Sequence, residues 1–192
     1  AGVDMITDIT AFDVDLNAAT GIGASNAREL AATQLDADST WGNVDLDNVA
    51  AAAVVVGTLS TGTGSILFDQ SGNQSMTLTN IDTTDGNVTI TNTGGTGAGI
   101  LVGDIDVDTT NDVVNLTSSG ANNDLTAGVD MVTDITDLDV DRNGANGIGA
   151  SNDTELAATQ LDADSNGGND DLGHVAAGLG AVGMLGSGTE RC

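Results

Sequence analysis

Residues 64–95 read GSILFDQSGNQSMTLTNIDTTDGNVTITNTGG, and this stretch decides the fold class. It holds three short apolar runs, at residues 65–68, 75–78 and 87–90, separated by turn sequences rich in Gly, Asn and Asp. Alternation of apolar and polar residues within the runs is typical of strands that bury one face. The stretch therefore predicts short strands joined by tight turns, with two strands and their turns forming a coil of about 20 to 24 residues.

The composition of the chain supports a narrow core. Of its 192 residues, 39% are hydrophobic but only 2% are aromatic. Small aliphatic side chains stacked in a thin space suit this composition better than a broad globular interior. Such acidity with so few aromatic residues is also typical of disorder, but the apolar runs favour a fold.

The charge of the chain is strongly negative. There are 29 acidic residues against three arginines, which gives a net charge of −26. Nucleic acids and anionic membranes would repel such a chain, so neither is an expected partner. No apolar stretch approaches the length of a membrane span, and the lone Cys192 excludes an internal disulfide.

A long internal repeat organises the chain. Residues 1–50 recur at residues 127–176 with about three-quarters of the positions identical. We divide the chain into repeat copy one (1–50), central β-solenoid coils (51–126), repeat copy two (127–176) and a Gly-rich tail or start of further coils (177–192). Duplication favours stacked coils. We therefore predict an all-β parallel β-helix, with an antiparallel β-sandwich array as the alternative.

Differences between the two copies predict which side chains face inward. Two positions stay apolar and are expected to face the core: Ile6 with Val132, and Phe12 with Leu138. Two positions change character and are expected to face solvent: Leu16 with Arg142, and Trp41 with Gly167. Residues 26–36 alone have apolar residues at helical spacing, and this segment is expected to form either a short helical turn or a corner of a coil.

Two stretches resemble a known family. GIGASNARELAATQLDADSTWGNVDLDNVAAAAVV at residues 21–55 and GIGASNDTELAATQLDADSNGGNDDLGHVA at residues 147–176 resemble repeats of very large bacterial surface proteins of the filamentous-haemagglutinin-like type. The resemblance implies a right-handed parallel β-helix, export across a Gram-negative envelope, and a role in adhesion, biofilm or cell-surface architecture.

Alternating acids provide the candidate ligand residues. Asp139, Asp141 and Asn143 precede a glycine, as at the start of a calcium loop, and a second cluster contains Asp162, Asp164 and Asn166. Weak calcium sites and solvent-facing acids on strands are both consistent with this pattern. Alternation alone predicts the latter for the stretch 104–108, with two inward aliphatic residues between three outward acids.

The sequence favours a structural role over catalysis. His174 is the only histidine, and no Gly-x-Ser-x-Gly motif occurs. We expect a secreted, extracellular module of the cell surface or of a filament, with no required cofactor beyond possible calcium. Its expected partners are further copies joined end to end, or cell-surface and matrix glycans or proteins. A calcium-responsive binding module and a polysaccharide-active β-helix enzyme are the alternatives.

Overall fold

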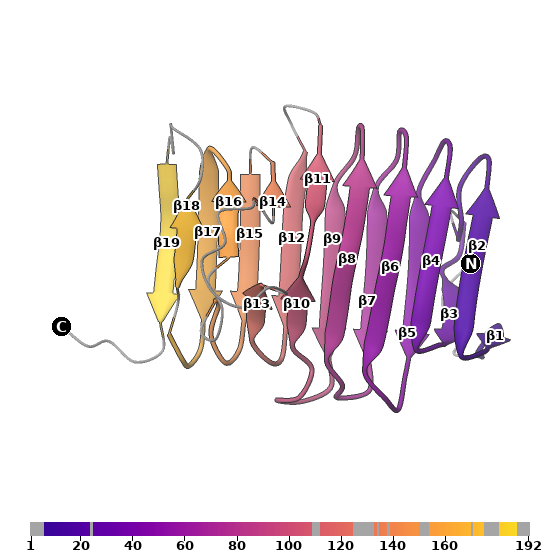
Figure 1. Cartoon of the computed structure of the whole chain (residues 1–192), viewed down its shortest axis with the longest axis horizontal. Coiled ribbons are helices and arrows are strands. Elements are labelled where there is room, and N and C mark those ends of the chain that lie inside the picture. The colour runs from indigo at the N-terminus through magenta and orange to yellow at the C-terminus, as the bar shows by residue number, and fades with distance from the viewer. Residues whose placement is uncertain are drawn as a thin grey trace.

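A computed structural model describes residues 6–23, 25–108, 112–124, 133, 135–137, 139–149, 154–169, 171–174 and 181–187. All the regular elements in these ranges are β-strands, arranged in two sheets that face each other. The strands of each sheet follow one another along one long axis (Figure 1). One sheet has nine strands: β1 (Ile9–Thr10), β3 (Arg28–Ala31), β5 (Val44–Val49), β7 (Ile66–Ser71), β9 (Val88–Thr93), β12 (Val113–Ser118), β15 (Asp139–Gly144), β17 (Gln160–Ser165) and β19 (Ala181–Ser187). The other has ten: β2 (Asp13–Ala18), β4 (Gln34–Ser39), β6 (Val54–Thr61), β8 (Met76–Thr83), β10 (Ile100–Val102), β11 (Ile105–Val107), β13 (Asn122–Asp124), β14 (Ile135–Thr136), β16 (Thr154–Ala157) and β18 (Leu172–His174).

The chain is a parallel β-solenoid, as the sequence predicted. Every strand pairs in parallel with the strand one coil away, which rules out the antiparallel sandwich. Val44 pairs with Ile66 and Ile66 with Val88, so these coils are equal in length and fall within the predicted range. The next step, from Val88 to Val114, is longer than the sequence predicted. Within the described ranges there is no helix able to cross a bilayer.

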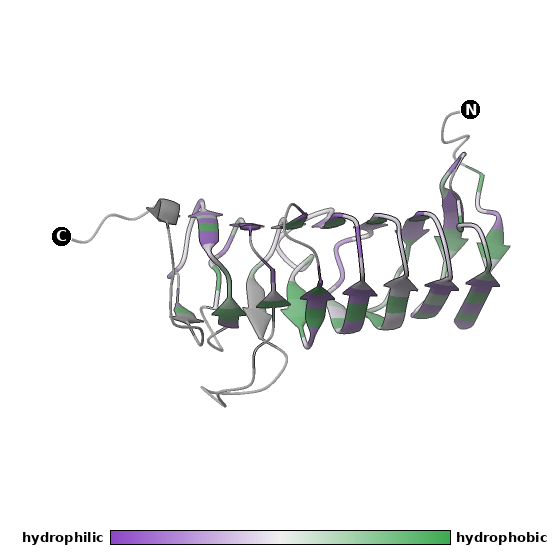
Figure 2. Cartoon of the chain, turned by 90° about the horizontal axis from the view of Figure 1, so that it is seen from above, coloured by the Kyte–Doolittle hydropathy of each residue, from purple (hydrophilic) through white to green (hydrophobic). Residues whose placement is uncertain are grey.

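The core is a thin aliphatic layer between the two sheets. Inward side chains alternate with outward ones along each strand, so hydrophobic and hydrophilic bands alternate on the ribbons in Figure 2. Leu46, Phe68 and Ile90 occupy one inward position on successive coils and are fully buried. The narrow space between the sheets therefore accounts for the scarcity of aromatic residues in the sequence.

Glycines allow the turns of successive coils to approach closely. A Cβ atom on Gly64 would lie 2.4 Å from the carbonyl carbon of Gly42, and one on Gly86 would lie 2.3 Å from the carbonyl oxygen of Gly64. Gly86 also has a φ of 148°, a conformation that side chains rarely adopt. Gly42, Gly64 and Gly86 occupy the same turn of successive coils, so each of these coils needs a residue without a Cβ atom at this turn.

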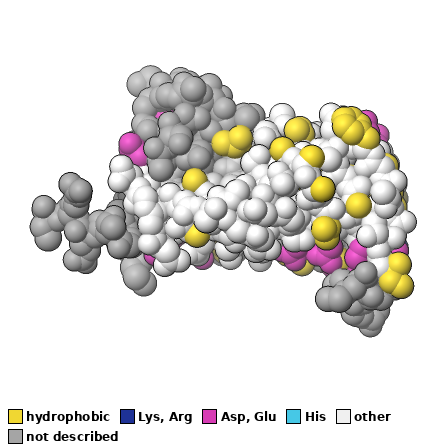
Figure 3. All heavy atoms as spheres, turned by 90° about the horizontal axis from the view of Figure 1, so that it is seen from below, with side chains coloured by type: hydrophobic (Ala, Val, Ile, Leu, Met, Phe, Trp, Pro, Cys, Tyr) yellow, Lys and Arg dark blue, Asp and Glu magenta, His cyan; other side chains and the backbone are white. Residues whose placement is uncertain are grey.

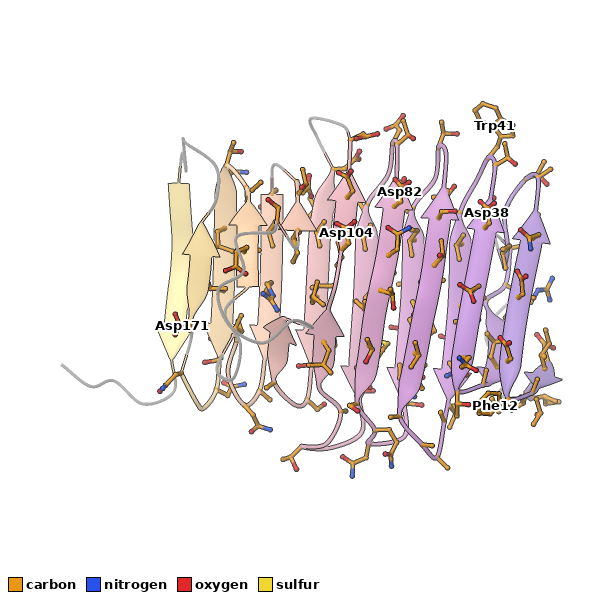
Figure 4. The ribbon with its side chains drawn as sticks, viewed as in Figure 1. Phe12, Asp38, Trp41, Asp82, Asp104 and Asp171 are labelled. Carbon is orange, nitrogen blue, oxygen red and sulfur yellow. The ribbon has the colours of Figure 1, made fainter. Side chains whose placement is uncertain are left out.

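Two aromatic residues near the N-terminus are exposed and lie at opposite ends of the strands (Figure 4). Trp41 is 59% exposed, which confirms the prediction that it faces solvent. Phe12 is 72% exposed and Ile6 is 68% exposed, so the prediction that these two side chains face the core is wrong. Phe12 occupies the corner between β1 and β2, where the inward and outward alternation of a strand does not apply. Their counterparts Val132 and Leu138 lie outside the described residues.

Arg142 is fully buried, so the prediction that it faces solvent is also wrong. Val140, Arg142 and Gly144 all point inward from β15, because they alternate with the outward residues of that strand. The residue paired with Arg142 on β17 is Ala163, and its small side chain leaves space for the guanidinium group. Asp137, just before β15, is also buried, and copy one has Ala11 at this position.

The segment 26–36 forms a corner, and its helical alternative is wrong. Residues 28–31 are β3 and residues 34–39 are β4, and the chain turns between the sheets at Ala32 and Thr33. Ala32 is buried at this turn and exchanges two hydrogen bonds with the side chain of Asn48. These bonds satisfy both backbone groups of Ala32, so a corner is stable without a helix.

The two repeat copies lie on opposite sheets. Strand β2 of copy one belongs to the ten-stranded sheet, but its counterpart β15 in copy two belongs to the nine-stranded sheet. The converse holds for β3 and its counterpart β16. Five steps along the nine-stranded sheet lead from β3 to β15, and β16 follows half a coil later. The repeat therefore spans five and a half coils, and the second copy is turned to the opposite side of the solenoid.

Candidate functional site

The outer face of the nine-stranded sheet carries an unbroken row of oxygen-bearing side chains. The row begins with Glu29, Asp47 and Asp69 on β3, β5 and β7, and we call these three residues the acidic row. The same row continues over the later coils with Thr91, Thr117, Asn143 and Asp164. Neighbouring members are about 4.8 Å apart, because each is one strand further along the axis. In Figure 3, acidic side chains gather along one edge over the coils near the N-terminus.

A pocket of about 370 Å³ opens over the acidic row. All three carboxylates of the row line it, and so does Thr91, whose hydroxyl donates a hydrogen bond to a carboxylate oxygen of Asp69. Val49, whose aliphatic side chain is exposed, also lines the pocket. Acidic and apolar surface therefore meet in one cavity, which we call the acidic pocket.

Glu29 is the most enclosed member of the acidic row. Its side chain is 8% exposed, and its Oε1 atom has no hydrogen-bond partner. The adjacent Arg28 does not supply one, because it is exposed and lies 3.8 Å from the carboxylate of Asp8. A buried carboxylate oxygen without a partner has a large desolvation cost, which a bound cation or donor would offset.

The carboxylates around the pocket destabilise one another's charged forms. Burial raises the pKa of Asp45, and the charges of Asp69 and Glu29 raise it further. Burial likewise raises the pKa of Asp47, with further contributions from Asp69 and Asp45. Like charges on adjacent strands favour protonation or the binding of a cation. This part of the sheet therefore has unfavourable electrostatics that positive charge would relieve.

The residues predicted from the sequence to bind calcium lie on the same face, toward the other end of the sheet. Asp139, Asp141 and Asn143 are on β15, and Asp162 and Asp164 are on β17. Asp141 pairs with Asp162 in the register of these strands, and Asn143 pairs with Asp164. The structure thus brings the two predicted clusters together as one group on a flat sheet. The last predicted ligand, Asn166, is exposed and follows the end of β17.

Within this group, the pKa of Asp141 is raised. Burial raises its pKa first, followed by the charges of Asp162, Asp139 and Asp164. The amide of Asn143 lies 3.4 Å from an Oδ1 atom of Asp141, so it contributes only a weak contact. In the described part of the chain, no group of three or more His, Cys, Asp or Glu side chains is arranged to hold a metal ion. Calcium binding at these residues stays a prediction.

Copy one shows the same arrangement on the opposite sheet. Asp15 pairs with Asp36, and Asn17 donates to Asp15 at 2.7 Å. Here the acids of β4 already have donors on β6, since Asp36 accepts from the Thr58 backbone at 2.8 Å. Asp38 accepts from Ser60 at the same distance.

A further acidic group lies on the ten-stranded sheet at β8 and β11. The alternation predicted for residues 104–108 is confirmed, with Ile105 and Val107 buried and the three acids exposed. Asp82 on the adjacent strand pairs with Asp106, and Figure 4 shows Asp82 and Asp104 on neighbouring parts of this sheet. Burial and the neighbouring carboxylates raise the pKa of both Asp82 and Asp106.

Sequence reasoning missed the acidic pocket. Glu29 lies in the segment interpreted as a helix or corner, and Asp47 and Asp69 follow much further along the chain. A signal was present, because Asp47 and Asp69 are one coil apart and occupy the same position in it. Glu29 lies beside Asp47 only because the chain turns between the sheets at Ala32 and Thr33. The composition of the segment does not predict where this turn falls.

No family model, curated protein or solved structure matches this chain.

Proposed function

We propose that this chain is a structural or adhesive β-solenoid module of a secreted bacterial surface protein or extracellular filament, with no catalysis. The supporting observation is the continuity of the stack across the duplication. Copy one and copy two use equivalent strands, and the sheets run from β1 to β19 through both copies. Each additional unit of the long repeat would extend the same core, so duplication lengthens the solenoid without a new fold.

The outer faces of the stack suit an extracellular role. Rows of Asp, Asn, Thr and Ser cover the nine-stranded sheet, and these side chains keep a long, flat sheet soluble. Such rows also offer repeated hydrogen-bonding groups to glycans or proteins at a cell surface. The resemblance of residues 21–55 to filamentous-haemagglutinin-like repeats is consistent with this role.

The lengthening role is tested with tandem copies of residues 1–126. Each unit contributes five and a half coils, so small-angle scattering should show rods that lengthen by about 26 Å per unit at constant cross-section. A scattering profile typical of separate units joined by flexible linkers would contradict the proposal.

Adhesion is tested by displaying the chain on a non-adherent bacterium and measuring retention on matrix-coated surfaces under flow. Retention no greater than that of undecorated cells would exclude the adhesive role.

Calcium-responsive binding is the second candidate function. It is favoured by the side-by-side placement of Asp141 with Asp162 and of Asn143 with Asp164, which concentrates oxygen ligands on one outer face. Extracellular calcium is abundant enough to occupy weak sites of this kind. Calcium would then stiffen the solenoid by joining successive coils.

A further inference from the structure

We propose that the acidic pocket binds a linear aliphatic oligoamine, with successive ammonium groups over Glu29, Asp47 and Asp69. The pocket combines three carboxylates in a row, a volume of about 370 Å³, and a buried Glu29 oxygen that has no partner. The last of these observations distinguishes the pocket from an ordinary acidic surface. A donor placed at Glu29 Oε1 would satisfy an otherwise unpaired buried acceptor.

The spacing of the row matches the spacing of amines. Adjacent members of the acidic row are one strand apart, about 4.8 Å along the axis. Two nitrogens joined by a three-carbon chain are about 5 Å apart when extended, because four bonds of about 1.5 Å separate them. Ammonium groups on such a chain can therefore each face one carboxylate, and the carbon atoms between them lie against the aliphatic lining.

The shape and lining of the pocket favour an organic cation over a bare metal ion. Its volume greatly exceeds that of one ion, and the exposed side chain of Val49 in its lining offers no oxygen ligand. The carboxylates are spread along the axis, and among the described side chains none form a group of three able to enclose a metal. A chain of ammonium groups needs one carboxylate at each step, which is what the row provides.

The pocket lies where copy one meets the central coils, and the matching strands of copy two lack its row of carboxylates. Glu155 in copy two corresponds to Glu29, but its strand partner is Gly173, at the position that corresponds to Asp47. The second copy therefore lacks the second carboxylate of the row. One oligoamine site per chain is expected.

The experiment is isothermal titration of the whole chain with bis(3-aminopropyl)amine at fixed ionic strength, because its two three-carbon spacers match the two steps between Glu29, Asp47 and Asp69. We expect one saturable site, and Glu29→Gln should weaken it about tenfold, since it replaces a charge-assisted partner with a neutral amide. Asp106→Asn is the matched control, because it removes the same charge from the opposite sheet. It should change the affinity less than about twofold, because its distance leaves only a screened interaction. Circular dichroism of both variants verifies the fold.

Three results would overturn the proposal. Equal weakening by the two variants would mean diffuse attraction to a polyanion. Tighter binding of 1,5-diaminopentane, whose nitrogen spacing falls between one and two steps of the row, than of 1,3-diaminopropane would contradict the match of spacings. Calcium binding that depends on Glu29 and is tighter than the binding of bis(3-aminopropyl)amine would assign the pocket to a metal.

Discussion

The Nδ2 atom of Asn48 donates a hydrogen bond to Oε1 of Gln70 at 2.6 Å, joining two successive coils inside the solenoid. Both side chains are buried at the same inward position of adjacent strands. Asn92 follows on the next coil and donates to the backbone oxygens of Gln74 and Gly99. A polar ladder thus runs along the edge of the aliphatic core and bonds the corners to the sheet.

Replacing Asn48 with Ala should destabilise the solenoid by about 1–3 kcal/mol. The substitution leaves the backbone groups of Ala32 and the side-chain oxygen of Gln70 without their present partner. Urea unfolding followed by circular dichroism measures the change. Asn80→Ala is the control, because Asn80 is exposed on β8, and it should alter the free energy of unfolding by less than about 0.5 kcal/mol. Equal effects of the two variants would show that the ladder contributes nothing.

Phe68→Ala should destabilise the chain by about 3–5 kcal/mol, because Phe68 is fully buried between the sheets. Phe12→Ala removes the same atoms from an exposed corner and should cost less than about 0.5 kcal/mol. The two midpoints in urea can be compared directly, since the chemistry of the substitution is identical. A large loss for Phe12→Ala would mean that this side chain packs against something in solution.

Acidification from neutral pH should stabilise the chain. The pKa values of Asp45, Asp47, Asp82, Asp106 and Asp141 are raised above the ordinary value of 3.8. The folded state therefore binds more protons than the unfolded state between 3.8 and the raised values, and stability rises as the pH falls through that range. Thermal unfolding at pH 7 and pH 5 and at constant ionic strength measures this.

The variant Asp141→Asn should reduce that pH dependence and raise the melting temperature at pH 7. It removes a charge that Asp162, Asp139 and Asp164 repel. A melting temperature that falls between pH 7 and pH 5 in the unaltered chain would contradict the assignment of unfavourable charge to the outer faces.

Calcium should raise the melting temperature more than magnesium does at equal ionic strength, if the group on β15 and β17 binds it. Replacing Asp141 and Asp162 together with Asn should then abolish the difference between the two ions. The matched control replaces Asp15 and Asp36, the equivalent pair in copy one, where Asp36 already accepts a backbone hydrogen bond. Identical melting curves in calcium and magnesium would leave the group as a passive acidic surface.

Sequence alone determined the class of fold. Short apolar runs with glycine and Asn turns recur at a nearly constant interval, and that interval is set by the length of a coil. Alternation within the stretch 104–108 also predicted correctly which side chains face the core, because a strand places successive residues on opposite faces. The exposure of Trp41 was predicted from its replacement by Gly167.

Only the tertiary structure decided which side chains become neighbours on successive coils. The long repeat is not a whole number of coils, so equivalent strands of the two copies lie on opposite sheets. Arg142 is buried because it faces inward from β15 beside Ala163, and this relation does not follow from local sequence. Glu29 lies beside Asp47, and Asp47 beside Asp69, because the register of their strands places them in one row. The length of each corner sets the register of every strand that follows it, and register determines which side chains become neighbours.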